Sequence, residues 1–237
     1  MASFFITGTD TNVGKTWATL ALMYYFKARG KQVIGMKPVA SGCDVSAEGL
    51  LHNADALLLQ AHSSVAMAYS SINPYAYLRA CSPHIAGADN PADLPLIKAA
   101  FEQLQQRAQV VLVEGAGGWY SPINARHSNC DLAQCLAIPV ILVVAIKLGC
   151  LNHALLSYEA LQNAGVACAG WLAVYTAPPP EEAALLIETL QQRLVAPLLG
   201  ILPYVTVADF AYLGGCIHSL SESPTNITRP ACPSVIL

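Results

Sequence analysis

Charged side chains are scarce in this sequence. Only 11% of its 237 residues are Asp, Glu, Lys or Arg, and the formal net charge is −3. A surface that binds nucleic acid needs clustered Lys and Arg, so this balance argues against a nucleic-acid partner. Hydrophobic residues instead reach 54%, which predicts a large buried core. The length suits one large α/β domain.

The sequence also lacks an apolar run long enough to cross a membrane. The uncharged stretch 132–146 contains Pro139 and ends before Lys147. It is shorter than the roughly 20 apolar residues that a spanning helix needs. No basic leader opens the chain, and Asp10 interrupts its first apolar stretch, unlike a signal peptide. We therefore expect a cytoplasmic protein with no membrane partner.

Closely spaced cysteine pairs are missing as well. The eight cysteines form no CxxC pair, and the nearest two, Cys130 and Cys135, have the wrong spacing for a zinc knuckle. Without an export signal, a framework of disulfides is not expected. Most of the cysteines should therefore be buried as small apolar side chains.

What the sequence does contain is a regular alternation of strand-like and helix-like segments. Short apolar runs rich in branched residues occur at 4–7, 32–38, 110–115, 139–146, 168–175 and 196–204. Apolar residues at helical spacing occur at 15–29, 54–61, 95–107, 151–163 and 181–194. Continuous hydrophobicity is typical of strands buried on both faces. The order predicts an α/β fold, in which helices cover both faces of a parallel sheet.

The domain organisation follows from the same pattern. We expect a single catalytic α/β domain over residues 1–220, with Gly30 and Gly165 ending two of its helices. Residues 78–95 contain three prolines and are predicted to form a long surface loop. Residues 221–237 are rich in Pro, Ser and Thr, and we expect an irregular tail there.

The segment GTDTNVGKT, residues 8–16, stands between the first predicted strand and the first predicted helix. Glycines let backbone N–H groups turn toward phosphates, a lysine such as Lys15 reaches them, and Thr16 can ligate Mg²⁺. Five residues separate Gly8 from Gly14, one more than in the common phosphate-binding loop. The arrangement predicts a P-loop NTPase-type site.

Three further side chains stand near the ends of predicted elements. Glu114 follows a buried strand and precedes a glycine loop, so it is either a metal ligand or a surface carboxylate. Lys37 also closes a strand, where it either faces the ligand or extends to solvent. Asp55 stands near a helix start, which by itself favours a first-turn acid over a metal ligand. Ligands bind at the carboxyl ends of parallel strands, and the glycines after Glu114 permit close approach, so its functional interpretation is favoured. For Lys37 both interpretations stay open.

Together these residues resemble a known family. The motifs GTDTNVGKT, KPVASG, NADALLLQ, SPH, VEGAGGWYSP and PVILVVAIKLGCLNHALL occur in this order, and the combination resembles the dethiobiotin synthetases of biotin biosynthesis. The resemblance runs from about residue 4 to residue 203, and the extra loop residue is characteristic of that family. It implies a homodimer that uses ATP and Mg²⁺ to convert 7,8-diaminopelargonate and CO₂ to dethiobiotin.

The resemblance also implies a role for individual residues. Thr16, Asp55 and Glu114 would hold Mg²⁺. Lys15 and Lys37 would flank a substrate carbamate and the γ-phosphate of ATP, with Thr11 and Ser41 as hydrogen-bonding partners. The nucleotide would be bound by Asn12, Val13, Gly14, Lys15, Thr16, Trp17, Asp55, Glu114, Gly115, Ala116, Gly117, Val174, Tyr175, Pro203, Tyr204 and Val205.

The distal carboxylate of the substrate would be bound across the dimer interface. By resemblance, Cys150, Leu151 and Asn152 supply a helix start for it, while Ser41 also contacts the substrate. The N-terminus of a helix suits a carboxylate, because its N–H groups and dipole favour negative charge.

The sequence departs from the family at two places. The family presents an Asn after the strand that contains Gly-Trp, whereas this chain has Val174 and Tyr175 there. The chain also diverges after Pro203, where further nucleotide contacts are expected. Both departures concern recognition of the base, and neither affects the phosphate chemistry.

Three other interpretations compete with a synthetase. Deviant-loop ATPases carry a lysine where this chain has Asp10. Amidating ligases of cofactor synthesis need a glutaminase domain, for which this length leaves no room. A paralogue that binds nucleotide without synthetase activity stays open as an alternative.

Overall fold

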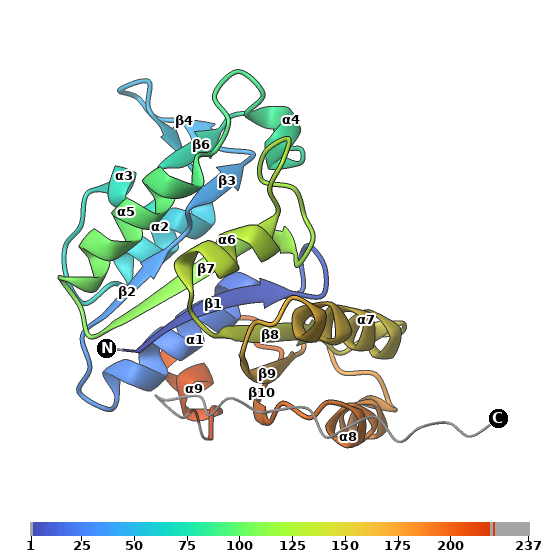
Figure 1. Ribbon diagram of the computed structural model, residues 1–237. Coiled ribbons are helices and arrows are strands. Elements are labelled where there is room, and N and C mark those ends of the chain that lie inside the picture. The colour runs from blue at the N-terminus through green and yellow to red at the C-terminus, as the bar shows by residue number, and fades with distance from the viewer. Residues whose placement is uncertain (1, 219, 221–237) are drawn as a thin grey trace.

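The computed structural model describes residues 2–218 and 220, so the predicted tail 221–237 lies outside the described residues. A six-stranded sheet crosses the centre of the molecule (Figure 1). Its strands are β1 (Ala2–Gly8), β2 (Val33–Met36), β7 (Val110–Gly118), β8 (Val140–Ala145), β9 (Cys168–Val174) and β10 (Leu198–Leu202). They pair in parallel in the order β10-β9-β8-β1-β7-β2. Each strand coincides with one of the predicted apolar runs, so the predicted parallel sheet is confirmed.

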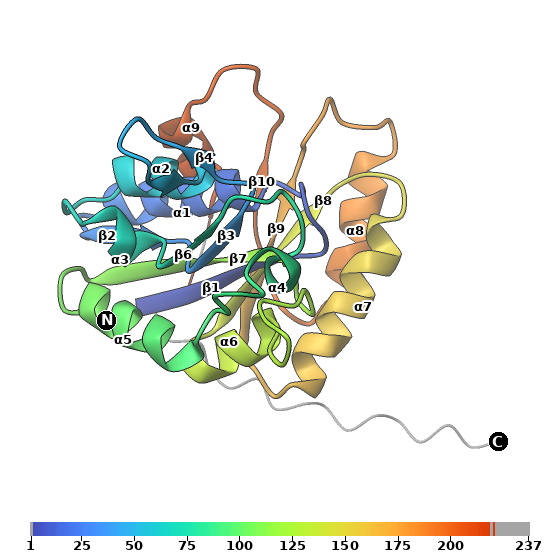
Figure 2. The same ribbon diagram turned by 90° about the horizontal axis from the view of Figure 1, so that it is seen from above.

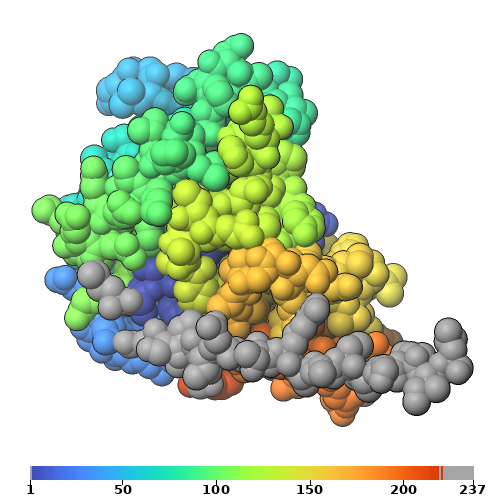
Figure 3. Space-filling model, viewed as in Figure 1, coloured from blue at the N-terminus to red at the C-terminus, as the bar shows by residue number. Residues whose placement is uncertain are grey.

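Helices cover both faces of this sheet, as Figure 2 shows from above. The helices on one face are α1 (Lys15–Lys27) and α9 (Phe210–Gly215). Those on the other face are α5 (Leu94–Gln105), α6 (Asn129–Leu136), α7 (Cys150–Asn163) and α8 (Ala183–Arg193). Helix α2 (Ala54–Ala61) packs beside β2. In the space-filling view, the side chains of α5, α6 and α7 hide most of the sheet (Figure 3).

The two layers of helices explain why the strand sequences are apolar without alternation. In β1, Phe5 packs into the core under α5 to α8, while its neighbours Phe4 and Ile6 pack into the core under α1 and α9. All three are fully buried. Since each face of the strand meets a helix layer, both sets of side chains must be apolar. Among the described residues, no helix is long and apolar enough to span a membrane.

The central position of β1 determines what surrounds the P-loop. Strand β7 pairs with β1 on one side, with Ile6 opposite Glu114, and β8 pairs with it on the other. The carboxyl ends of these strands therefore meet at one edge of the sheet. Two small sheets lie apart from the central one, formed by β3 (Val39–Ser41) with β6 (Tyr75–Tyr77) and by β4 (Asp44–Val45) with β5 (Leu51–His52).

Several local elements differ from the sequence-based expectation. The prediction of one long loop over 78–95 is wrong, because α4 (Pro83–Ala86) interrupts it and α5 begins at Leu94. Proline suits the first turn of α4, where its missing N–H costs nothing. Helices α3 (Tyr69–Ile72), α6 and α9 were not predicted either. The two helix stops at Gly30 and Gly165 are confirmed, with φ angles of 73° and 69°.

Candidate active site

The P-loop connects the end of β1 to the start of α1, as its sequence predicts. Gly14 precedes the helix with a φ of 87°, a left-handed conformation that favours glycine. A methyl group at this position would lie only 2.7 Å from Cγ1 of Val174, so the close approach of β9 also requires glycine. The ammonium of Lys15 donates a hydrogen bond to the carbonyl oxygen of Asp10 at 2.8 Å. This bond folds the lysine back over its own loop.

Lys37, Asp55 and Glu114 form a connected group beside the P-loop. The ammonium nitrogen of Lys37 lies 2.5 Å from Oε1 of Glu114 and 3.0 Å from Oδ2 of Asp55. The hydroxyl of Thr16 donates to the same Glu114 oxygen at 3.0 Å. Glu114 lies in the buried part of β7, Lys37 follows β2, and Asp55 stands in the first turn of α2. Thus three different elements supply the charges.

Burial controls the electrostatics of this group. Glu114 is fully buried, and only 6% of Lys37 and 7% of Lys15 are exposed. Burial by itself would lower the pKa of Lys37, but the charges of Glu114 and Asp55 outweigh it, and the pKa is raised. Burial tends to raise the pKa of Asp55, yet the Lys37 ammonium holds it below its usual value. For Lys15 burial dominates and lowers the pKa to about 8.

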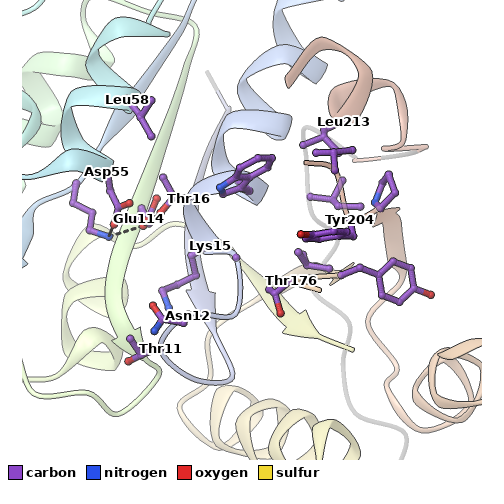
Figure 4. A pocket seen from close by; sticks show the side chains of 18 of the residues that line it. Thr11, Asn12, Lys15, Thr16, Asp55, Leu58, Glu114, Thr176, Tyr204 and Leu213 are labelled. Carbon is purple, nitrogen blue, oxygen red and sulfur yellow. Dashed lines mark hydrogen bonds and ion pairs between the residues drawn. The ribbon is translucent and has the colours of Figure 1, made fainter. Parts of the chain in front are cut away.

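These side chains line a cavity of about 450 Å³ at the carboxyl edge of the sheet. Figure 4 shows Asp55 and Glu114 on one side of Lys15 and Thr16, with Thr176, Tyr204 and Leu213 on the other. The sequence-predicted residues that line the cavity are Thr11, Asn12, Gly14, Lys15, Thr16, Trp17, Lys37, Asp55, Glu114, Gly117, Val174, Tyr175, Pro203, Tyr204 and Val205. They come from five strand ends and two helices, so the fold brings together residues up to 194 positions apart along the chain, from Thr11 to Val205.

The other predicted residues do not line this cavity. Those predicted for the nucleotide are Val13, Gly115 and Ala116, of which Val13 belongs to the core under α1. The substrate candidate Ser41 stands half-buried at the end of β3, while Cys150, Leu151 and Asn152 begin α7. The thiol-bearing side chain of Cys150 is buried, and its backbone N–H donates to the carbonyl of Lys147 at 3.0 Å.

The cavity contains the donors of a possible Mg²⁺ site. Oε2 of Glu114 is buried and has no hydrogen-bond partner among the described residues, and Thr16 and Asp55 offer further oxygens nearby. No group of three or more His, Cys, Asp or Glu side chains in the described part of the chain could hold a metal. Mg²⁺ is commonly bound by only one or two carboxylates together with substrate phosphates. The oxygen donors therefore fit a metal site that a nucleotide completes.

Comparisons with known proteins agree with this geometry. A protein-family model described as "AAA domain" matches residues 2–210. ATP-dependent dethiobiotin synthetase BioD of Pseudescherichia vulneris is 44% identical over 236 residues, which cover 96% of this chain and 98% of that protein. The chain belongs to the dethiobiotin synthetase family.

Other members of the dethiobiotin synthetase family show comparable similarity. ATP-dependent dethiobiotin synthetase BioD 1 of Escherichia coli (strain K12) is 45% identical, over 85% of this chain and 90% of that protein. BioD of Yersinia pestis bv. Antiqua (strain Angola) is 46% identical, over 86% of this chain and 85% of that protein.

Solved structures with low sequence identity share the fold of this dethiobiotin synthetase family member. The MinD cell division protein of Aquifex aeolicus has a TM-score of 0.56 at 16% identity, covering 90% of this chain and 87% of that one. The signal recognition particle receptor FtsY of Elizabethkingia anophelis has a TM-score of 0.51 at 12% identity, covering 91% and 64%. These likenesses show a P-loop NTPase fold and no more.

Some residues of the cavity were missed by the sequence reasoning. Leu58, Thr176, Leu202 and Leu213 line it without having been predicted. Leu58 follows Asp55 by three residues on α2, so helical spacing could have indicated it. Leu213 could not have been found in this way, because α9 itself was not predicted.

Asn129 was also missed, although it supports the site. It is only 1% exposed and donates from its side-chain amide to the carbonyl oxygens of Ala116 and Gly118, at 2.7 Å each. These two bonds hold the glycine loop that follows Glu114. An asparagine at the start of a predicted helix would have suggested a structural role for this side chain. No helix was predicted at this position, so the sequence offered no such signal.

Proposed function

We propose that this protein is an ATP-dependent dethiobiotin synthetase. The observation that carries the proposal is the convergence of Lys15 and Lys37 with two carboxylates beside a P-loop, in a member of this family. The reaction would join 7,8-diaminopelargonate, CO₂ and ATP to give dethiobiotin, ADP and phosphate. A nucleotide-binding paralogue or a deviant-loop ATPase would need neither a diamine nor a buried lysine at position 37.

The chemistry joins anions, which explains the need for fixed cations. One amine of the substrate adds to CO₂ and loses a proton, which gives a carbamate. A carbamate oxygen then attacks the γ-phosphorus, and the bond from that phosphorus to the bridging oxygen of ADP breaks. The second amine attacks the carbonyl carbon of the mixed anhydride and expels phosphate, which closes the cyclic urea.

The roles of the side chains follow from where negative charge develops in these steps. Lys15 and Lys37 would stabilise the negative charge on the phosphoryl oxygens and on the carbamate as it moves. Both ammonium groups are buried, so their attraction for the anions is weakly screened by water. Thr11 and Ser41 would donate or accept hydrogen bonds at the substrate end. No strong base is needed at the attacking oxygen, because the carbamate already carries the charge.

We also propose that Mg²⁺ accompanies the nucleotide. Thr16, Asp55 and Glu114 would hold it, and the bound ion would neutralise part of the phosphate charge. Support comes from the unpartnered Oε2 of Glu114. The remaining P-loop and strand-end residues of the cavity would bind the phosphates and the base.

A homodimer with a shared substrate site is the third part of the proposal. The substrate carboxylate would meet the first turn of α7, where Leu151 and Asn152 present N–H groups beside Cys150. Gly149 turns the chain into this helix with a φ of 87°. The preceding Leu148 is 99% exposed, so a second subunit that docks at this helix start would bury an apolar side chain.

We place the protein in the cytoplasm. All seven cysteines among the described residues are free. Free thiols are typical of a reducing compartment, and ATP and CO₂ are both present there.

The activity itself can be tested directly. Purified protein supplied with diaminopelargonate, bicarbonate, Mg²⁺ and ATP should release phosphate and form a cyclic urea that mass spectrometry identifies. Each reagent omitted in turn should stop both products. Phosphate release that does not depend on the diamine would instead support a switch ATPase, and nucleotide binding without any product would support the inactive paralogue.

A further inference from the structure

The cavity has two ends of opposite chemical character. Asp55 and Glu114 stand at one end with Lys37, and the P-loop lysine Lys15 lies between this end and Tyr204 (Figure 4). Phosphates bind over the P-loop, since its N–H groups and Lys15 carry the positive potential. If the acids and lysines surround the γ-phosphate, the base of a nucleotide must lie at the opposite end.

That opposite end offers few polar side chains. Its polar groups are the hydroxyl groups of Tyr175, Thr176 and Tyr204 and the indole N–H of Trp17. The indole N–H only donates, and every base has an acceptor to offer it. The apolar members are Val174, Leu202, Pro203, Val205 and Leu213. Among the described residues that line this end, none has an amide or a charged side chain. A hydroxyl group rotates and both donates and accepts, so it does not distinguish the donor and acceptor pattern of one base from that of another.

The backbone around Val174 is already hydrogen-bonded. The carbonyl oxygen of Val174 accepts from the N–H of Ile146 at 3.0 Å, and the N–H of Tyr175 donates to the carbonyl of Leu202 at 3.0 Å. The N–H of Tyr175 is therefore not available to a base, and Pro203 has no N–H to donate. The side chain of Val174, which is 4% exposed and abuts Gly14, has no polar atom with which to read the edge of a base.

We propose that this site selects the triphosphate and not the base, so that ATP, GTP, CTP and UTP bind with similar affinity. The inference rests on the proposed nucleotide role of the cavity, and it adds a class of substrate to it: nucleoside triphosphates in general. Aromatic and apolar surfaces contact any base through its π face, with little dependence on its edge groups. We expect the four affinities to lie within about tenfold, which corresponds to about 1.4 kcal/mol.

The first test measures binding without turnover. Calorimetric titration with the Mg²⁺ complexes of the non-hydrolysable β,γ-methylene analogues of the four nucleotides gives four dissociation constants. Values within about tenfold support the proposal, and a preference for the ATP analogue of a hundredfold or more overturns it. Because no diamine is present, this result does not depend on synthetase activity. A protein that binds all four analogues but forms no dethiobiotin would refute the proposed function and leave this inference standing.

The second test introduces the missing amide. Val174→Asn supplies one donor and one acceptor at the wall of the cavity, and Val174→Thr is a control that adds only a hydroxyl to the same shape. The ratio of ATP-analogue to CTP-analogue affinity should rise at least tenfold in Val174→Asn and stay near the wild-type value in Val174→Thr. An unchanged ratio in a folded Val174→Asn protein would show that the base does not lie against Val174, and would overturn the assignment of the base to this end of the cavity. If that variant does not fold, the four dissociation constants of the wild-type protein still test the proposal.

Discussion

The ammonium group of Lys37 lies 2.5 Å from Oε1 of Glu114, although 77 positions separate the two residues along the chain. Both are buried, and Asp55 completes the contact at 3.0 Å. The lysine thus occupies the position between two carboxylates that are also the candidate metal ligands. In the proposed reaction Lys37 must also bind anionic groups of the substrates. We therefore expect its contacts with Glu114 and Asp55 to change when nucleotide and metal bind.

Lys37→Ala should reduce turnover strongly and leave nucleotide binding largely intact. Removing one preorganised electrostatic donor typically lowers kcat by about 10²–10³, whereas the P-loop and Lys15 keep their contacts with the phosphates. Steady-state kinetics and calorimetric titration with the ATP analogue separate the two effects. Lys98→Ala, which removes an exposed lysine on α5, is the matched control. Near-normal turnover of Lys37→Ala would show that this lysine only neutralises Glu114.

Lys37→Met should make Mg²⁺ a stabiliser of the nucleotide-free protein. The substitution leaves Glu114 buried without its cation, which costs about 3–5 kcal/mol for a buried pair, and Mg²⁺ could compensate part of that charge. We expect Mg²⁺ to raise the Tm of Lys37→Met by several degrees more than that of the wild type, since about 1 kcal/mol shifts Tm by about 2–4 °C at this size. Scanning calorimetry at constant ionic strength measures the difference.

The double variant Lys37→Met/Glu114→Gln is the control for this experiment. It removes the buried charge together with its partner, so it should recover stability relative to Lys37→Met and lose the response to Mg²⁺. Equal Mg²⁺ responses in all three proteins would contradict the assignment of Glu114 as a metal ligand.

The sequence predicted the strands and the loop of this site better than its contacts. Glu114 and Lys37 each follow an apolar run. Because ligands bind at the carboxyl ends of parallel strands, both residues could be predicted to lie at the same edge of the sheet. The bond between them could not be predicted, because it depends on β2 and β7 being neighbours, and strand order is a property of the whole fold. Helix α6 was missed for a local reason. From Leu132 onward its short sequence is uncharged and leads into the apolar strand β8, and only the capping pair Ser128–Asp131 marks its start.

Nucleotide binding should take up a proton at alkaline pH. Lys15 has a pKa of about 8 because burial disfavours its charge, so at pH 9 most of the unliganded protein has a neutral Lys15. Phosphates favour the charged form, and the bound pKa must therefore be higher. Affinity should fall as the pH rises from about 8 toward that bound pKa. Titration at pH 9 in two buffers of different ionisation enthalpy should report on the order of one proton taken up, and no uptake would contradict this assignment.

A charge at the start of α7 should weaken the proposed dimer. Leu148→Glu places a carboxylate on a side chain that is 99% exposed, so the fold of each subunit should be unaffected. If a second subunit covers this residue, burying the charge is costly, and sedimentation velocity should show a shift toward monomer. Leu96→Glu, at a 62% exposed position on α5, is the control. A wild-type monomer that is fully active at assay concentration would remove the shared-site proposal.

Asn129→Ala should destabilise the protein and loosen the glycine loop after Glu114. The amide of Asn129 is the donor to two carbonyl groups in that loop, and losing a buried partner typically costs about 1–3 kcal/mol. Asn129→Asp should be worse than alanine, because it turns a carboxylate toward the same two carbonyl oxygens. Gln134→Ala, which removes an exposed amide from the same helix, should change the midpoint of urea denaturation very little. Because Gly117 of this loop lines the cavity, Asn129→Ala should also weaken binding of the ATP analogue at temperatures where it is still folded. An alanine variant with wild-type stability and affinity would mean that the loop keeps its shape without Asn129.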